Sequence, residues 1–250
     1  MLAVIGGSGL GSLRGEVRAL EMETIEAIRT PYGGPVQVDI CRLKNVRIAF
    51  LPRHAAGDRV PAHKVNYKAN IWALQSLGVD RIIATNTVGG ISEDLPPGAM
   101  AIPEQLIDYT WGRESSYFDG ADQEPRHIDF TWPYDLSLRE ALRDAAARVE
   151  KPIKFGGVYG VLQGPRLETA AEILRLRRDG CDMVGMTSMP EAVLARELEI
   201  PYVCLALSVN WAAGLGDGVI DMKDIKRVHG FGTVELIGII EALIESEALK

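Results

Sequence analysis

Long apolar runs, paired cysteines and an excess of basic charge are all missing from this sequence, and each absence removes a class of protein. No run approaches the ~20 apolar residues of a membrane-spanning helix, and the first residues lack the basic start of a signal peptide. The three cysteines, Cys41, Cys181 and Cys204, are too few and too scattered for a disulfide framework or a zinc site. We therefore expect no membrane partner and a location in a reducing cytoplasm.

The formal charge of −7 argues against binding to nucleic acid, which depends on a basic surface. An anionic small molecule stays possible, because net charge says little about a single cleft. The sequence has no Walker loop, no His-Glu-x-x-His and no Gly-x-Ser-x-Gly motif. The four histidines, His54, His63, His127 and His229, lack the spacing of metal ligands. These absences favour a reaction without metal or cofactor, in which phosphate itself is a reactant.

Strand-like apolar runs alternate with amphipathic helices along the 250 residues, which is typical of the α/β class. No linker or repeat divides the chain, so we expect one domain over residues 1–250. The predicted strands are 2–5, 47–51, 81–85, 156–162, 182–186 and 203–209, and the predicted helices are 65–77, 138–149, 169–178, 190–198 and 233–249.

A glycine-rich loop, Gly6–Gly11, directly follows the first predicted strand. Glycines let backbone N–H groups approach an anion closely, and the Ser8 hydroxyl adds a donor. A plain tight turn is the alternative interpretation. A dinucleotide-binding protein is another, from a different functional class, but Ser12 stands where the third glycine of that fingerprint belongs.

Three further strand ends carry donors suited to phosphate. Arg53 and His54 follow the second predicted strand, and Asn86 and Thr87 follow the third. Thr187 precedes a helix N-terminus, where N–H groups and the helix dipole favour anions. An arginine in such a loop is often merely solvated, and neighbouring Ser188 and Glu191 have the spacing of a capping box. Because strand ends of an open α/β sheet meet in one crevice, the four loops together predict a phosphate site.

The strand Val203–Trp211 runs from apolar residues into a single amide, Asn210. A carboxamide offers two donors and one acceptor, which suits the polar edge of a purine base. Asn210 could equally be a turn residue. Asn210 follows a strand, as the predicted phosphate-binding residues do. Taken together with them, it favours a nucleoside as the second ligand.

Together these residues resemble the purine nucleoside phosphorylase family, in particular its methylthioadenosine phosphorylase branch. The resemblance implies a single α/β domain with a central mixed, partly barrelled β-sheet flanked by helices. It also implies a pentosyltransferase that uses inorganic phosphate as co-substrate and needs no cofactor. The matching segments cover nearly the whole chain: Ile5–Leu10, Pro52–His54, Lys64–Leu74, Gly160–Arg166 and Met186–Glu191.

The resemblance also assigns roles to individual residues. It implies that Met186 packs against the ribose, that Asn210 faces the base, and that His127 reaches into a neighbouring subunit's site, as in a homotrimer. The phosphate-binding residues that it implies are Ser8, Arg53, His54, Asn86, Thr87 and Thr187.

Two departures from the family pattern predict the substrate. Adenine-specific members carry two aspartates beside the base, where this chain has Asn210 and Ala212. An asparagine can donate to O6 and N7 of a 6-oxopurine, which an ionised aspartate cannot do. Met222 falls where inosine-specific members hold the 5′-hydroxyl with a histidine, and it suits a methylthio group, although His229 lies close by in sequence.

We therefore predict phosphorolysis of S-methyl-5′-thioinosine to hypoxanthine and 5-methylthioribose 1-phosphate. Phosphorolysis of methylthioadenosine, or of 6-oxopurine nucleosides in general, remains the alternative within the same class of enzyme.

Overall fold

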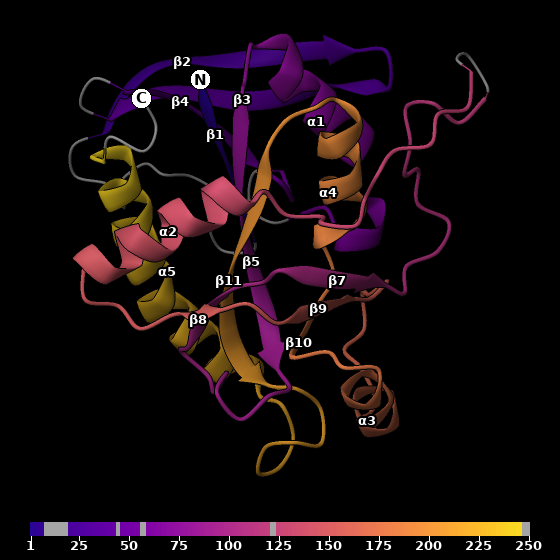
Figure 1. Ribbon diagram of the computed structural model, residues 1–250, viewed down its shortest axis with the longest axis vertical. Helices are drawn as coiled ribbons and strands as arrows, with labels where there is room; N and C mark the ends of the chain where they lie inside the picture. The colour runs from indigo at the N-terminus through magenta and orange to yellow at the C-terminus, as the bar shows by residue number, and fades with distance from the viewer. Residues whose placement is uncertain (8–19, 44–45, 56–58, 121–123, 247–250) are drawn as a thin grey trace.

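The computed structural model describes residues 1–7, 20–43, 46–55, 59–120 and 124–246, which form a mixed β-sheet with helices on both faces (Figure 1). Its main strand order is β2-β3-β4-β1-β5-β10-β9-β7, and β11 pairs with β5 and β6, and β6 with β8. The strands are β1 Leu2–Gly6, β2 Leu20–Thr30, β3 Gly33–Leu43, β4 Val46–Pro52, β5 Arg81–Gly90, β6 Met100–Ile102, β7 Gln105–Asp108, β8 Lys154–Phe155, β9 Val158–Val161, β10 Met183–Gly185 and β11 Tyr202–Trp211.

Two helical layers cover the sheet, because successive side chains of a strand point to opposite faces. Ala3 and Ile5 pack with helices α1 and α4, whereas Leu2 and Val4 pack with α2 and α5. The helices are α1 Tyr67–Ser76, α2 Leu136–Arg148, α3 Ala170–Arg178, α4 Ser188–Glu197 and α5 Met222–Ile244, with a 3-10 turn at Ala62–Lys64. This arrangement confirms the predicted α/β class with a mixed sheet flanked by helices.

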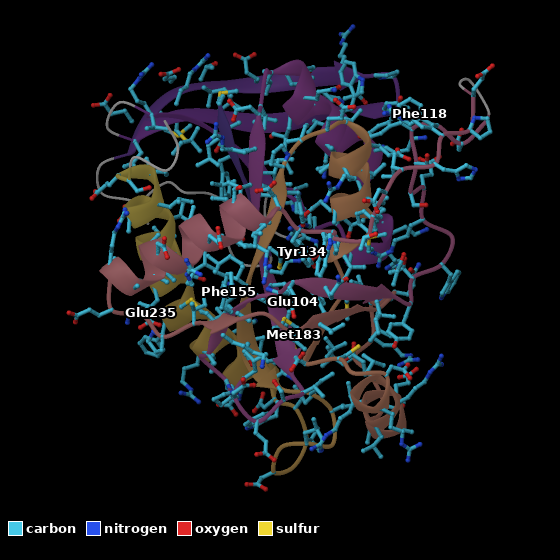
Figure 2. All side chains as sticks on the ribbon, in the orientation of Figure 1. Glu104, Phe118, Tyr134, Phe155, Met183 and Glu235 are labelled. Atoms are coloured by element: carbon cyan, nitrogen blue, oxygen red, sulfur yellow. The ribbon has the colours of Figure 1, made fainter. Side chains whose placement is uncertain are left out.

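The side chains follow the same layering (Figure 2). Tyr134 and Met183 lie in the interior and are almost fully buried, whereas Glu235 lies on the outer side of α5. In the part of the chain that the structure describes, no helix is both long enough and apolar enough to cross a bilayer.

Strand β5 is the centre of the sheet, and two different strands share one of its edges. Parallel β1 pairs with its first half, residues 81–84, and antiparallel β10 pairs with its last residues, Gly89 and Gly90. Strand β11 occupies the opposite edge from Ile82 to Gly90. Residues 85–88 therefore lie between the end of β1 and the end of β10, at a break in the hydrogen-bonded ladder.

The structure corrects two predicted boundaries. The strand predicted to end at Thr85 continues to Gly90, because its glycines permit close packing rather than a turn: a Cβ on Gly90 would lie 1.9 Å from the Leu95 carbonyl oxygen. The helix predicted to begin at Thr233 begins at Met222. The prediction missed its first turns because they are largely exposed and polar and show no apolar stripe. Strands β2, β3 and β6–β8 were not predicted at all.

Candidate active site

A cavity of about 320 Å³ opens at the break beside β5. Its wall is built from the residue after β1, the segments after β4 and β9, strand β5, strand β10 with the turn after it, the end of β11 and the start of α5. Ser8 lies outside the described residues, but its neighbour Gly7 lines the cavity. The structure brings seven of the predicted residues to this wall: Arg53, His54, Thr87, Met186, Thr187, Asn210 and Met222.

Arg53 is fixed by a buried ion pair that the sequence interpretation missed. Its Nε and one Nη donate to the two carboxylate oxygens of Glu191 at 2.7 and 2.8 Å, and its other Nη donates to the Thr85 carbonyl oxygen at 2.9 Å. Both charged side chains are fully buried, and the Tyr202 hydroxyl donates to Glu191 at 2.8 Å. Burial alone would lower the pKa of Arg53, but the adjacent Glu191 carboxylate outweighs it and raises that pKa.

The alternative interpretation of Ser188 and Glu191 as a capping box is therefore wrong. Glu191 is turned toward Arg53, and the Ser188 hydroxyl lies 2.7 Å from that of Tyr134. Thr187 occupies the N-cap position of α4 without a capping hydrogen bond from its side chain. Its hydroxyl lies instead 2.7 Å from the amide of Asn86 on β5. The signal that could have found Glu191 is chemical, since a buried arginine needs a carboxylate nearby.

The start of the glycine loop packs directly on β5. The backbone N–H of Gly7 donates to the Thr85 hydroxyl at 3.0 Å, which in turn donates to the Ile5 carbonyl oxygen at 3.1 Å. A Cβ on residue 7 would lie 2.6 Å from the Thr85 carbonyl oxygen, so only glycine fits. This contact holds the end of β1 at the floor of the cavity.

His54 is oriented by its own loop. Its Nδ1 lies 2.8 Å from the Val60 carbonyl oxygen, which can only accept, so this nitrogen carries the proton. The imidazole lines the cavity from the turn after β4, next to Arg53 in the chain, and Thr87 lines it from β5.

Asn210, Glu168, Met222 and Ile225 also line the cavity. Asn210 pairs with Gly89, further along β5 than Thr85, which Arg53 contacts, so the lining changes in character toward the end of β5. Asn210 follows an irregularity in the β5–β11 pairing, and its side-chain N–H donates to the Trp211 carbonyl oxygen at 2.6 Å. Glu168, which sequence reasoning missed, is the acidic residue among the described residues of this wall. Burial raises the pKa of Glu168. The nearby Glu172 carboxylate adds to this rise, and the Arg166 charge opposes it.

Three predicted residues do not line the cavity. Asn86 lies behind Thr187, Ala212 is buried under Gly89, and His127 is exposed at the surface. His229, the neighbour of Met222 in the sequence interpretation, lines an adjoining small pocket beside Thr233 on α5, which shares Gly7 and Thr87 with the cavity.

Comparison with known proteins agrees with this geometry. Methylthioadenosine phosphorylase from Schistosoma mansoni, solved in complex with adenine, superimposes with a TM-score of 0.90 at 28% identity, over 97% of this chain and 90% of that one. The fold is thus that of a nucleoside phosphorylase. The phosphorylase superfamily model matches residues 1–245, and the chain belongs to this family. The predicted family and enzyme class, a pentosyltransferase of the purine nucleoside phosphorylase type, are confirmed.

Two curated relatives are similar over nearly their full length. A protein of Xanthomonas campestris named probable S-methyl-5′-thioinosine phosphorylase is 51% identical over 244 residues, which are 95% of each chain. The 6-oxopurine nucleoside phosphorylase of Pyrococcus furiosus is 39% identical over 248 residues, covering 97% of this chain and 91% of the relative.

Proposed function

We propose that this protein catalyses phosphorolysis of S-methyl-5′-thioinosine, releasing hypoxanthine and 5-methylthioribose 1-phosphate. The observation that carries the proposal is the arrangement of one cavity. Arg53, His54, Thr87 and Thr187 line the part that we assign to phosphate, and Asn210 and Glu168 with apolar Met222 and Ile225 line the part that we assign to the nucleoside. Phosphate, a 6-oxopurine and an apolar 5′ substituent each have a matching surface there.

At the phosphate end, the site combines one cation with neutral donors. The Arg53 charge is balanced by Glu191, so the phosphate is held by directed N–H and O–H groups rather than by excess positive charge. Thr87 and Thr187 supply hydroxyls from β5 and from the turn after β10. Ser8 would add a donor, and Asn86 would act by orienting Thr187.

At the base end, the two polar side chains match hypoxanthine better than adenine. A 6-oxopurine presents O6 and N7 as acceptors and N1–H as a donor, which Asn210 and the Glu168 carboxylate complement. Adenine has an unprotonated N1, which would face the carboxylate without a hydrogen bond. Such mismatches in a buried site discriminate strongly, because polar groups are left unpaired.

The ribose side favours a methylthio group over a hydroxyl. Met222 and Ile225 at the start of α5 line the cavity, and His229, two turns along the helix, faces another pocket. Met186 would pack against the ribose. A thioether gains from apolar contact, whereas a 5′-hydroxyl would need a polar partner.

The reaction that we propose follows from this placement. Phosphate lies below C1′ of the nucleoside, and the glycosidic bond breaks to give an oxocarbenium-like ribosyl group. The phosphate dianion stabilises this charge and then bonds to C1′. Asn210, whose amide nitrogen carries a second hydrogen besides the one given to Trp211, donates to N7 or O6 as negative charge develops on the base. Positioning two reactants in one site can supply ~7–11 kcal/mol of the barrier.

The test is the identity of the released base. The purified protein is mixed with phosphate and, separately, with S-methyl-5′-thioinosine, methylthioadenosine and inosine, and initial rates of base release are measured. We expect hypoxanthine from the thio compound at the highest kcat/KM. Faster release of adenine would overturn the substrate assignment, and equal rates on inosine would favour a general 6-oxopurine phosphorylase instead.

We also propose that the enzyme is a cytoplasmic homotrimer that uses no cofactor besides its phosphate co-substrate. The exposure of His127, away from the cavity of its own chain, fits a role at a neighbouring subunit's site. Light scattering should give three times the 27.3 kDa chain mass, and a monomer with full activity would contradict the proposal.

A further inference from the structure

We propose that Arg113 is a positioning residue that fixes two segments of the cavity wall relative to each other. This inference rests on the proposed function. Arg113 lies in the segment after β7 and does not line the cavity itself. Nothing in its sequence surroundings singles it out.

The two walls in question follow neighbouring parallel strands. The loop after β9 provides Pro165, Leu167 and Glu168, and the turn after β10 provides Met186 and Thr187. The regular ladder between β9 and β10 ends at residues 161 and 185. Beyond that point, backbone carbonyl groups of both segments need donors from elsewhere.

Arg113 supplies those donors. One Nη donates to the carbonyl oxygens of Met186 and Met189 at 2.8 and 2.6 Å. The other Nη donates to those of Leu162 and Gln163 at 3.2 and 2.8 Å, and Nε donates to the Gln163 side-chain oxygen at 3.0 Å. A guanidinium has five N–H donors in a fixed plane, and all five have acceptors in these two segments.

These contacts hold the guanidinium at a fixed position between the two segments. Its Met186 and Met189 contacts bracket Thr187, and its Gln163 contacts lie just before the turn that carries Glu168. The segments touch directly as well, since a Cβ on Gly164 would lie 2.5 Å from the Met186 sulfur. The guanidinium also lies over the Tyr67 ring at 5.6 Å, which restricts it from the side of α1.

Arg113 therefore couples the phosphate-facing hydroxyl of Thr187 to the base-facing carboxylate of Glu168. Because its donors are all engaged with protein acceptors, it acts through these residues and not on the substrate. Lysine cannot replace it, since an ammonium group is a compact point with three donors.

Two substitutions, Arg113→Lys and Arg113→Ala, test the inference, with Arg177→Ala on the exposed side of α3 as control for lost charge. We expect Arg113→Ala to lower kcat about 100-fold and Arg113→Lys about 10-fold, as misplacement of a site by ~1 Å does. The KM values for phosphate and nucleoside should change less than about threefold, because the substrate contacts themselves remain. Arg177→Ala should retain wild-type kinetics.

Several results would overturn the inference about Arg113. Full kcat in the lysine variant would mean that only the charge matters, and a large rise in KM at unchanged kcat would mean direct substrate contact. If the alanine variant does not fold, the lysine variant decides the question.

A second measurement does not depend on turnover. Hydrogen exchange of the lysine variant should show faster exchange of amides in both 162–168 and 186–189, with the β2–β3 hairpin unchanged. Unchanged exchange, or loss of protection in one segment alone, would refute the coupling. Wild-type protein that is inactive on every nucleoside would refute the proposed function and leave this exchange test standing.

Discussion

The two ends of the cavity are built in different ways. At the phosphate end, Arg53 and Glu191 are fully buried and joined by two hydrogen bonds, and each is held by a further partner on β5 or β11. At the nucleoside end, Asn210 is partly exposed and Met222 is 56% exposed. One end belongs to the folded core, and the other lies on its surface.

This difference separates stability from specificity. Phosphate is common to every reaction considered for this fold, and its site is made of side chains whose removal would leave buried polar groups unpaired. The base and the 5′ substituent distinguish those reactions, and they meet side chains with fewer partners. Substitutions at the first end should therefore affect folding and activity together, whereas those at the second should affect catalysis or substrate choice with little change in folding.

The largest effect is expected from Glu191→Gln. The substitution leaves the Arg53 charge buried without its counterion, which typically costs about 3 to 5 kcal/mol. Urea unfolding should show a large drop in midpoint with little change in slope. Phosphorolysis should fall as well, because Arg53 loses the contact that orients it.

A surface ion pair provides the control. Lys151 and Glu235 are each more than one-third exposed, so Glu235→Gln should change the free energy of unfolding by less than about 1 kcal/mol. Similar losses from both substitutions would remove the distinction between a core end and a surface end.

Asn210→Ala should have the next largest effect, on catalysis rather than on stability. Loss of a donor to developing negative charge typically lowers kcat by about 100- to 1,000-fold. The free energy of unfolding should change by less than about 1 kcal/mol, because the side chain is partly exposed and bonds mainly to the adjacent backbone. Steady-state kinetics and urea unfolding of the same preparation measure both.

Asn210→Asp sharpens the result. An ionised carboxylate accepts from the 6-amino group of adenine and repels O6, so relative activity should shift toward methylthioadenosine. Ala212 is buried under Gly89 and supplies no second carboxylate, so we expect a partial shift. Unchanged preference would place the base elsewhere in the cavity.

The sequence predicted the class of fold and most of the polar side chains of the cavity wall, for physical reasons that can be named. Strand β1 is a continuous apolar run, and β11 is apolar from Tyr202 to Leu207, so that the polar Asn210 near its end stands out. Strand β2 could not be recognised in this way, because it is largely exposed and charged residues such as Glu21, Glu23 and Glu26 interrupt its apolar residues.

The partners inside the site were less predictable than its wall. Glu191 is 138 positions from Arg53, and its spacing from Ser188 imitates a helix cap. Glu168 carries no local pattern, and its role depends on the loop that turns it into the cavity. Long-range pairing between polar residues leaves no periodicity in a single sequence.

Glu168→Gln tests the nucleoside end through pH. Burial raises the pKa of this carboxyl above its usual value of 4.5, so it becomes protonated at a higher pH than an exposed glutamate. The ionised carboxylate is a stronger acceptor for N1–H than the protonated carboxyl group. KM for the 6-oxopurine nucleoside should therefore rise as the pH falls through that raised pKa. We expect the glutamine variant to show a KM about 10-fold higher at neutral pH, with this acid dependence abolished. An identical pH profile in both proteins would exclude Glu168 from base recognition.

The smallest effect is expected from Met222→Ala, at the most exposed position of the nucleoside end. A contact with one methylthio group is worth about 1–3 kcal/mol when the pocket is closed, and the exposure of Met222 places it at the low end of that range. The ratio of kcat/KM for S-methyl-5′-thioinosine to that for inosine should fall about 10-fold, with unfolding unchanged. Because inosine lacks the thioether, its own kcat/KM should stay nearly constant. An equal loss on both nucleosides would mean that Met222 supports the cavity as a whole, and the surface end would then share the structural role of the core end.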